Sequence, residues 1–284
     1  MSSLDILITK ANGAKQFFDR EKIVRTCLRM GADRRTAYEV TEKVERRLYD
    51  GISSAKILQM IFLFMRKGQP NVTRLYDLRK GISLMTPKPE FEIFVQILLA
   101  HNGFEVTPNQ IIAGNCVEHE VDAVAKKNGV TYFVEAKHHF NYHALTGLDE
   151  SRIARALLED VTEAYELGKI SQKIDKAMIV TNTKYSEHAM KYGKCRNILQ
   201  IGWNTPADLS LQNMIEETNL YPLSCLKDLK KDIREKLLQS GIVLLKQVSA
   251  EDLAALARKT GLRKQILERI REQAEPGNFP FSRL

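Results

Sequence analysis

Apolar and polar residues alternate along residues 118–127 and again along 130–137, and the two runs meet at an Asn-Gly pair. Alternation with a period of two is typical of β-strands, because successive side chains point to opposite faces of a sheet. Asn-Gly favours the two-residue type I′ turn, in which both residues take positive φ. The pattern therefore predicts a β-hairpin with residues 128–129 at its tip.

This predicted hairpin carries four charged side chains on one face. Counting outward from the turn places Asp122 opposite Glu135. The same count places Glu120 opposite Lys137, two residues further along each strand. Opposed carboxylates repel each other unless a cation lies between them, so the pattern predicts a divalent metal site held by Asp122 and Glu135. A hairpin with these charges on a solvated face is the alternative, although the largely apolar flanks of both strands argue against it.

Apolar spacing around the hairpin predicts the rest of an α/β region. A helix is expected from residue 91 to near residue 103. Buried strands are expected at 176–183 and 198–203, with a short helix between them. Two prolines within residues 86–89 prevent a helix from continuing and mark the joint before this region.

The N-terminal part has its own pattern. Residues 6–23 predict a short strand, an Asn-Gly turn, a second strand and a helix start capped by Asp19. Ser53 and Asn71 are further candidate caps. The helices are expected at 21–31, 34–50, 53–67 and 70–80.

From residue 226 onward the pattern is helical again. One helix is expected to end at Gly241. A capping box at Ser249–Asp252 opens a second helix over 253–259, and Gly261 separates it from a third over 266–274. Four basic side chains flank the turn around this last glycine: Arg258, Lys259, Arg263 and Lys264.

The spacing of Asp122, Glu135 and Lys137 resembles the Asp…Glu-x-Lys signature of the restriction-endonuclease-like nucleases. The sequence over residues 90–205 is similar to the Mrr branch of that superfamily. The resemblance implies an endodeoxyribonuclease that depends on Mg²⁺ or Mn²⁺, with Asp122 and Glu135 as metal ligands. It implies that Lys137 orients the attacking water or stabilises the charge that grows on the phosphate.

Two further acids belong to this expected site. The helix that begins near residue 91 resembles the first core helix of the family, whose glutamate lies near the metal, and this points to Glu92. Glu120 is either a second metal ligand or the salt-bridge partner of Lys137, and the register favours the second role. The chain departs from many Mrr-type enzymes in having Glu135 where they carry glutamine, but glutamate is the commoner residue in the wider superfamily.

Residues 4–84 resemble the ATP-cone, a regulatory nucleotide-binding module. The matching features are the hairpin, the Phe-Asp-Arg-Glu-Lys-Ile helix start and a final helix carrying Tyr76. The resemblance implies that Lys10 and Lys22 contact the phosphates of ATP or dATP, while the chain departs from the family at Ala11, where a second basic residue is common. No Walker-type loop is present, so the nucleotide would regulate the protein and would not be hydrolysed. A small helical DNA-binding or dimerisation domain is the alternative.

The C-terminal helices partly resemble a helix-hairpin-helix module, which presents backbone N–H groups to DNA phosphates. The turn at Thr260-Gly261-Leu262 has one glycine where stronger examples have two. The resemblance implies that the four basic residues flanking this turn contact double-stranded DNA. A helical packing or oligomerisation domain is the alternative.

Charge and composition add to this picture. Residues 1–85 contain 17 basic and 9 acidic side chains, so they supply an excess equal to the +8 of the whole chain. Basic surface favours polyanionic partners, such as nucleotides or nucleic acids. The four cysteines have no CxxC spacing, which disfavours a zinc ribbon or a disulfide framework. With neither a membrane-length apolar run nor a signal peptide, a cytoplasmic protein without membrane association is expected.

The sequence therefore predicts a multi-domain α/β protein. It would comprise a mainly helical ATP-cone with a small hairpin at 1–85, a restriction-endonuclease-like core with a mixed sheet at 86–222, and an all-α domain at 223–284. The expected function is cleavage of double-stranded DNA by a homodimer or higher homo-oligomer under nucleotide control. The alternatives are a nucleotide-responsive DNA-binding regulator that does not cut and a nuclease that resolves Holliday junctions.

Overall fold

The computed structural model describes residues 6–10, 13–29, 32–68, 78–226 and 229–274. The chain divides into two compact units. One comprises residues 1–76, 226–230 and 248–284, and the other comprises residues 77–225 and 231–247. This division differs from the predicted domain bounds of 85 and 222, because residues 77–85 and 231–247 group with the central region.

The first unit begins with a two-stranded antiparallel hairpin, β1 (Leu7–Thr9) and β2 (Lys15–Phe17), followed by three helices. These helices are α1 (Arg20–Arg29), α2 (Arg34–Glu45) and α3 (Ser54–Gly68). Asp19 accepts the backbone N–H of Lys22 at 3.2 Å, and Ser53 accepts that of Lys56 at 3.2 Å, so both predicted caps are confirmed. The second helix is shorter than expected, and the predicted cap Asn71 and Tyr76 lie outside the described residues.

Apolar faces of these helices form a continuous core. Its fully or almost fully buried members include Val24, Cys27, Ala37, Val40, Val44, Ile52 and Met65. Val40 and Val44 lie one turn apart on α2, the spacing that places side chains on the same helix face. Helix periodicity in the sequence is therefore enough to explain this core.

Three short helices follow near the C-terminus: α10 (Leu245–Ala250), α11 (Leu253–Thr260) and α12 (Lys264–Ala274). The expected capping box is wrong, because Ser249 lies inside α10. Asp252 caps α11 instead and accepts two backbone N–H groups at 2.9 Å. Gly261 ends α11 with a φ of 67°, the left-handed conformation that glycine adopts without strain. Arg271 of α12 donates hydrogen bonds to the carbonyl oxygen of Val248.

The second unit contains a five-stranded mixed sheet. Its strands are β3 (Glu105–Ala113), β4 (Glu118–Lys127), β5 (Val130–Lys137), β7 (Lys176–Thr181) and β9 (Leu199–Ile201). The strand order is β3-β4-β5-β7-β9. The first three strands run antiparallel to their neighbours, whereas β5, β7 and β9 run parallel. The predicted mixed sheet is confirmed, and so is the positive φ of Asn128 and Gly129 in the hairpin turn.

The helices of this unit are α4 (Leu78–Ser83), α5 (Glu92–His101), α6 (Leu148–Glu166), α7 (Glu187–Cys195), α8 (Leu211–Thr218) and α9 (Lys231–Gln239). Shorter elements are the turn η3 (Pro87–Phe91), the 3₁₀ turn η4 (Leu223–Cys225) and the small parallel pair β6 (Leu145–Thr146) and β8 (Lys184–Tyr185).

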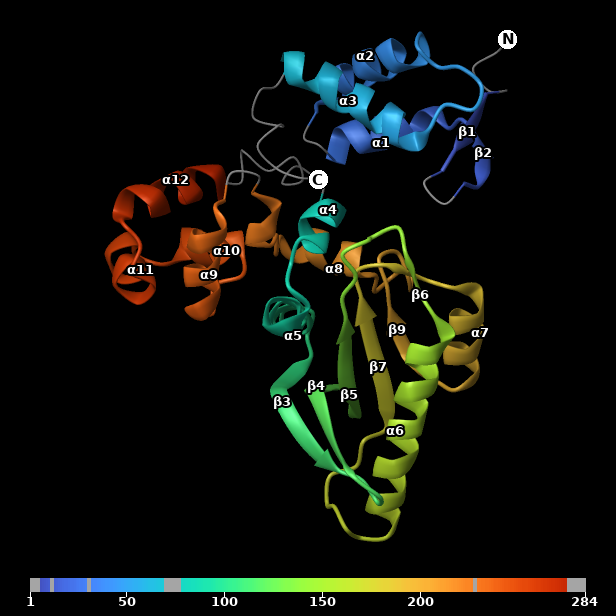
Figure 1. The fold of residues 1–284 in the computed structure, drawn as a ribbon, viewed down its shortest axis with the longest axis vertical. Coiled ribbons are helices and arrows are strands. Elements are labelled where there is room, and N and C mark those ends of the chain that lie inside the picture. The colour runs from blue at the N-terminus through green and yellow to red at the C-terminus, as the bar shows by residue number, and fades with distance from the viewer. Residues whose placement is uncertain (1–5, 11–12, 30–31, 69–77, 227–228, 275–284) are drawn as a thin grey trace. The chain divides into compact units, whose positions relative to one another are not determined.

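Helices α6 and α7 lie beside the sheet (Figure 1). Leu158 and Val161 of α6 pack in one core with Phe133 of β5 and Ile179 of β7. Helix α5 contacts β3 and β4, and its residues Phe94, Val95, Leu98 and Leu99 are at most 1% exposed. Within the described residues, no helix is both long enough and apolar enough to cross a membrane.

One buried ion pair joins α9 to the turn that precedes α5. Glu90 is 2% exposed, and Arg234 donates hydrogen bonds to both of its carboxylate oxygens, with an Nε–Oε1 distance of 2.9 Å. Arg234 also donates to the carbonyl oxygen of Leu84 at 2.7 Å, and the backbone N–H of Thr86 donates to Glu90 Oε2 at 2.9 Å. The Glu90 carboxylate therefore accepts hydrogen bonds from both the Arg234 guanidinium group and the Thr86 backbone. Through these bonds α9 fixes the segment that leads into α5.

Replacing Arg234 with methionine should lower the free energy of unfolding by roughly 3 kcal/mol, because it leaves the buried Glu90 carboxylate without its charged partner. Urea unfolding followed by circular dichroism measures this change. Lys231→Met is the matched control, since Lys231 pairs with Glu235 on the surface, and it should cost less than about 0.5 kcal/mol. Equal losses in the two variants would contradict the role assigned to Arg234.

Candidate active site

The sheet opens at the position of Asp122. Register between β4 and β5 runs from the turn to Ala123 opposite Val134 and stops one pair before Asp122 and Glu135. Beyond that point the Asp122 carboxylate takes the place of a backbone acceptor, because its Oδ2 accepts the N–H of Ala136 at 2.7 Å. The predicted register is therefore correct from the turn to Ala123 and Val134. Asp122 and Glu135, the next residues outward, do not form a backbone-paired position.

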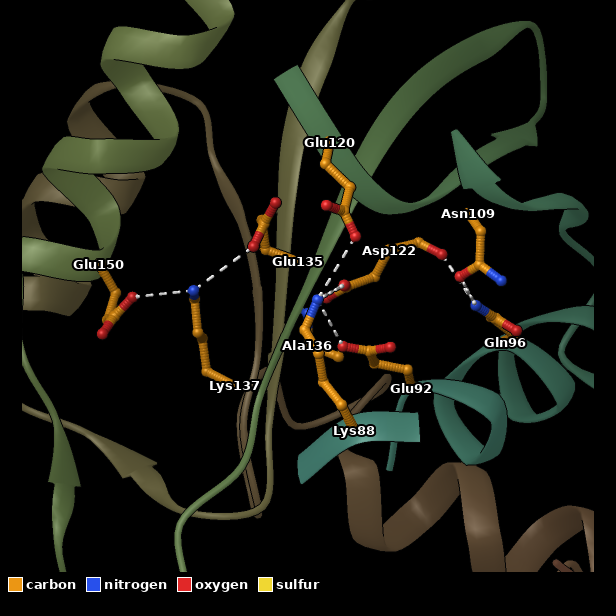
Figure 2. Close-up of polar contacts among 10 residues, drawn as sticks. All are labelled: Lys88, Glu92, Gln96, Asn109, Glu120, Asp122, Glu135, Ala136, Lys137 and Glu150. Atoms are coloured by element: carbon orange, nitrogen blue, oxygen red, sulfur yellow. Dashed lines mark hydrogen bonds and ion pairs between the residues drawn. The ribbon is translucent and has the colours of Figure 1, made fainter. Parts of the chain in front are cut away.

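A second contact fixes the backbone of Asp122 from α5. Gln96 of α5 donates its amide to the Asp122 carbonyl oxygen at 2.8 Å, and the same amide lies 3.4 Å from Asn109 Oδ1 of β3. Asn109 has a φ of 50°, a left-handed conformation that interrupts the regular course of β3. Side chains from α5 and β3 thus hold the opened sheet in a defined geometry (Figure 2).

Three carboxylates gather around the ammonium group of Lys88 (Figure 2). Lys88 Nζ lies 3.2 Å from Glu92 Oε1, 3.6 Å from Glu120 Oε1 and 3.8 Å from Asp122 Oδ1. The Glu92 and Asp122 side chains are only 10% and 12% exposed, whereas Glu120 is 78% exposed. The structure therefore brings Glu92 to the predicted site, as expected, and it adds a lysine that sequence reasoning missed.

The catalytic lysine of the expected site has different partners from those predicted. Lys137 Nζ lies 3.4 Å from Glu135 Oε2 and 3.6 Å from Glu150 Oε2 at the start of α6. Glu120 pairs with Lys88 instead, so the predicted salt bridge between Glu120 and Lys137 is wrong. The physical reason is the opening of the sheet, which separates the outer ends of β4 and β5 and leaves each lysine with the nearest acids.

Burial and like charge shift the pKa values of the site acids. Burial, followed by the negative charge of Asp122, raises the pKa of Glu135 above its ordinary value. The same two causes raise the pKa of Glu92, with Lys88 opposing them. For Lys137, burial lowers the pKa, but Glu135 and Glu150 outweigh it and the net pKa is raised. The site therefore keeps its lysine protonated while it disfavours further negative charge.

This donor set fits a hard divalent cation. Mg²⁺ in proteins is usually held by one or two carboxylates, with water and substrate phosphate completing its shell. Asp122 and Glu135 supply two such carboxylates, and burial followed by the negative charge of Asp122 raises the pKa of Glu135. In the described part of the chain, no three acids, histidines or cysteines are arranged as a preformed cage. Asp122 and Glu135 are therefore the two residues of this cluster that would hold such an ion.

The chain that follows Lys137 is fixed by hydrogen bonds to the end of β7. Asn182 accepts the N–H of His139 at 2.8 Å and donates to the His139 carbonyl oxygen at 2.8 Å. The buried hydroxyl of Thr146 lies 2.9 Å from that of Thr181 and 2.7 Å from that of Thr183. These contacts lock the segment that leads from Lys137 to Glu150, and they explain why a Thr-Asn-Thr sequence follows the buried strand.

The remaining predicted site residues lie in the other unit. Lys10 and Lys22 are exposed, the first beside the hairpin and the second in the first turn of α1. The side chains of Arg258, Lys259, Arg263 and Lys264 are exposed around the turn between α11 and α12. Lys259 Nζ lies 3.3 Å from Glu251 Oε1. These positions suit contact with an anion, and their predicted roles stay predictions.

Sequence reasoning missed Lys88, Glu150 and Gln96. Lys88 lies between the two prolines that mark the joint before this region. Its backbone is not helical there, so its spacing of four residues from Glu92 gives no helical-pair signal. Glu150 lies in the first turn of α6, where an acid is expected for its interaction with the helix dipole alone. Gln96 carried no signal, because an amide on the apolar helix α5 has no distinctive pattern.

Comparison with known proteins agrees with this geometry. Residues 83–201 match the restriction endonuclease family of the Mrr catalytic type. A curated protein from Archaeoglobus fulgidus, described as uncharacterized, is 36% identical over 151 residues, which cover 53% of this chain and 81% of that protein. The chain therefore belongs to the same family as this archaeal protein, and its residues 83–201 form a restriction endonuclease-type domain.

A solved structure shows the same fold. The crystal structure of a protein of unknown function, AF1548, matches with a TM-score of 0.56 and 31% sequence identity. The match covers 70% of this chain and 96% of that chain. The likeness supports the assignment of the fold.

Replacing Glu135 with glutamine should stabilise the metal-free protein by roughly 1 kcal/mol, the usual size of the gain when a strained site charge is removed. A raised pKa means that the charged carboxylate is less stable in the folded state than in the unfolded state. The gain should therefore be present at neutral pH and shrink as the pH falls below the pKa of folded Glu135. Thermal melting in a chelator at pH 7.5 and pH 4.5 measures this, with exposed Glu166→Gln of α6 as the control. A lower melting temperature for Glu135→Gln at pH 7.5 would contradict it.

Proposed function

We propose that this protein is an endodeoxyribonuclease that uses Mg²⁺ or Mn²⁺ to hydrolyse phosphodiester bonds in double-stranded DNA. The observation that carries the proposal is the meeting of Asp122, Glu135 and Lys137 where β4 and β5 separate, within a domain of the restriction endonuclease type. A fold alone does not define an activity, so the proposal depends on these three side chains.

Each side chain has a distinct role in this proposal. Asp122 and Glu135 would hold the metal ion, which supplies polarisation of the phosphate and a more acidic bound water. Lys137 remains protonated because Glu135 and Glu150 flank it, so its ammonium group is available to donate to a phosphate oxygen or to a water molecule. The Asp122 carboxylate is fixed by the Ala136 N–H, which lowers the cost of arranging the site for the reaction.

Glu92 and Glu120 have supporting roles. Glu92 is mostly buried at the start of α5 and faces the same charged cluster, so it would bind a water molecule of the metal shell. Glu120 is largely exposed and paired with Lys88, which suits an outer position at the mouth of the site. Both acids contribute negative potential that attracts a divalent cation.

The central prediction is that the wild-type protein nicks or linearises supercoiled plasmid with Mg²⁺ or Mn²⁺ but not with a chelator. Asp122→Asn and Lys137→Met should each reduce the cleavage rate by at least about 100-fold, because each removes a group that acts on the reacting phosphate. Gel analysis of plasmid forms measures the rate. The control is Lys176→Met, which removes a lysine from the opposite end of β7 and should cut at the wild-type rate.

The other outcomes have defined meanings. Binding of plasmid that weakens with salt, without any cleavage in either metal, would replace the proposal with a DNA-binding regulator. Cleavage confined to four-way junctions in a parallel assay would assign the chain to the junction-resolving nucleases.

We also propose that the N-terminal unit binds ATP or dATP through Lys10 and Lys22, and that the exposed basic turn between α11 and α12 binds the DNA backbone. The support is exposure and charge: both lysines are accessible, and residues 1–85 carry the net positive excess. Nucleotide binding would control cleavage by changing the assembly of a homodimer or higher oligomer.

The double variant Lys10→Ala/Lys22→Ala should bind a fluorescent ATP analogue at least about tenfold more weakly than wild type, because two phosphate contacts are lost. Fluorescence titration measures the affinity, and light scattering with and without dATP measures the assembly. Lys43→Ala, which removes an exposed lysine from α2, is the control. Equal affinities for all three proteins would remove the nucleotide site from the proposal.

A further inference from the structure

Lys88 lies where a cation is needed by the acids of the proposed active site. Its ammonium group is within 3.8 Å of carboxylate oxygens from Glu92, Glu120 and Asp122, and these acids come from two elements, α5 and β4 (Figure 2). An ordinary surface pair joins one cation to one acid and contributes little to stability. Here one ammonium group offsets the repulsion among three carboxylates, two of which are nearly buried.

The backbone that carries Lys88 is fixed, while its side chain can leave. Residues on both sides are anchored, because the Thr86 N–H donates to Glu90 and Glu90 is held by Arg234. Phe91, which follows, is fully buried. The Lys88 side chain itself is 66% exposed, so its long aliphatic chain can turn into solvent without any rearrangement of the core. Lys88 thus carries its positive charge on an exposed side chain whose backbone is held in place.

The charges near this position favour exchange of one cation for another. Glu92, Glu120, Asp122 and Glu135 contribute four acids, and Lys137 is already engaged by Glu135 and Glu150. A divalent ion held by Asp122 would lie within a few ångströms of the Lys88 ammonium group in its present position, and like charges at that separation repel strongly in a partly buried site. The ammonium group and the metal therefore compete for the negative charge of the Asp122 carboxylate.

We propose that Lys88 is a tethered competitor of the divalent metal. It offsets the charge of the acid cluster when no metal is bound, and binding of a metal at Asp122 displaces it from that carboxylate. The lysine thereby stabilises the metal-free protein and raises the metal concentration needed to load the site. This inference rests on the proposed function, since it requires that the acids bind a metal.

The test is Mn²⁺ binding to the full-length protein without DNA, measured by electron paramagnetic resonance of the free ion. Lys88→Met keeps the length of the side chain and removes its charge, so it should bind Mn²⁺ on the order of tenfold more tightly than wild type. Lys88→Arg keeps the charge and should retain affinity close to that of wild type. Lys191→Met, which removes an exposed lysine from α7, controls for the change in net charge.

A second measurement separates competition from a structural role. In a chelator, Lys88→Met should melt at a lower temperature than wild type, because the three acids lose their shared cation. Saturating Mn²⁺ should then raise the melting temperature of Lys88→Met by more than it raises that of wild type. If Lys88 only supported the fold, Lys88→Met would lower the melting temperature by the same amount in chelator and in saturating Mn²⁺. Its Mn²⁺ affinity would then equal that of wild type.

The failures of the two proposals give different results. Unchanged or weaker Mn²⁺ binding by Lys88→Met, with normal binding by wild type, overturns the competitor role and leaves the nuclease proposal standing. Failure of both wild type and Lys88→Met to bind Mn²⁺ overturns the metal site, and with it both proposals.

Discussion

The central unit is organised around repulsion between carboxylates at the open end of a β-hairpin. Asp122 and Glu135 belong to neighbouring strands, and burial followed by the charge of Asp122 raises the pKa of Glu135. The fold tolerates this because Asp122 accepts a backbone N–H, while Lys88 and Lys137 bring positive charge from two sides. Close carboxylates of this kind cost stability, and such strained, charged clusters are typical of functional sites. The rest of the sheet, with its apolar faces covered by helices, holds these charges together.

Much of this arrangement could be predicted from the sequence because it depends on local rules. The hairpin followed from an Asn-Gly turn and alternation along two strands, and its register was correct as far as Ala123 and Val134. The helix caps Asp19 and Ser53 also followed from local chemistry. The presence of Glu92 at the site came from family resemblance rather than from spacing, since nothing in the pattern of α5 alone brings it near β4.

Other features could not be predicted, because they depend on contacts between distant parts of the chain. Counting residues from the turn assumes that the two strands stay paired along their whole length. It therefore gives no sign that β4 and β5 separate at Asp122. The exchange of partners by Glu120 and Lys137 follows from that separation. The place of α9 in the central unit depends on the ion pair between Glu90 and Arg234, which lie 144 residues apart. The sequence pattern predicts a domain boundary after residue 222. The contact between Arg234 and Glu90 nevertheless joins α9 to the central unit.

The ion pair between Glu90 and Arg234 also determines how short a stable fragment of the central unit can be. The family match ends at residue 201, yet a chain cut there, or at residue 222, would leave a buried carboxylate without its guanidinium partner only two positions from Glu92. It would also lose the bridge between Pro222 and Leu244, which joins the segment after α9 to the end of the central region. A fragment that keeps both contacts therefore has to extend at least through Leu244, well beyond residue 201, where the family match ends.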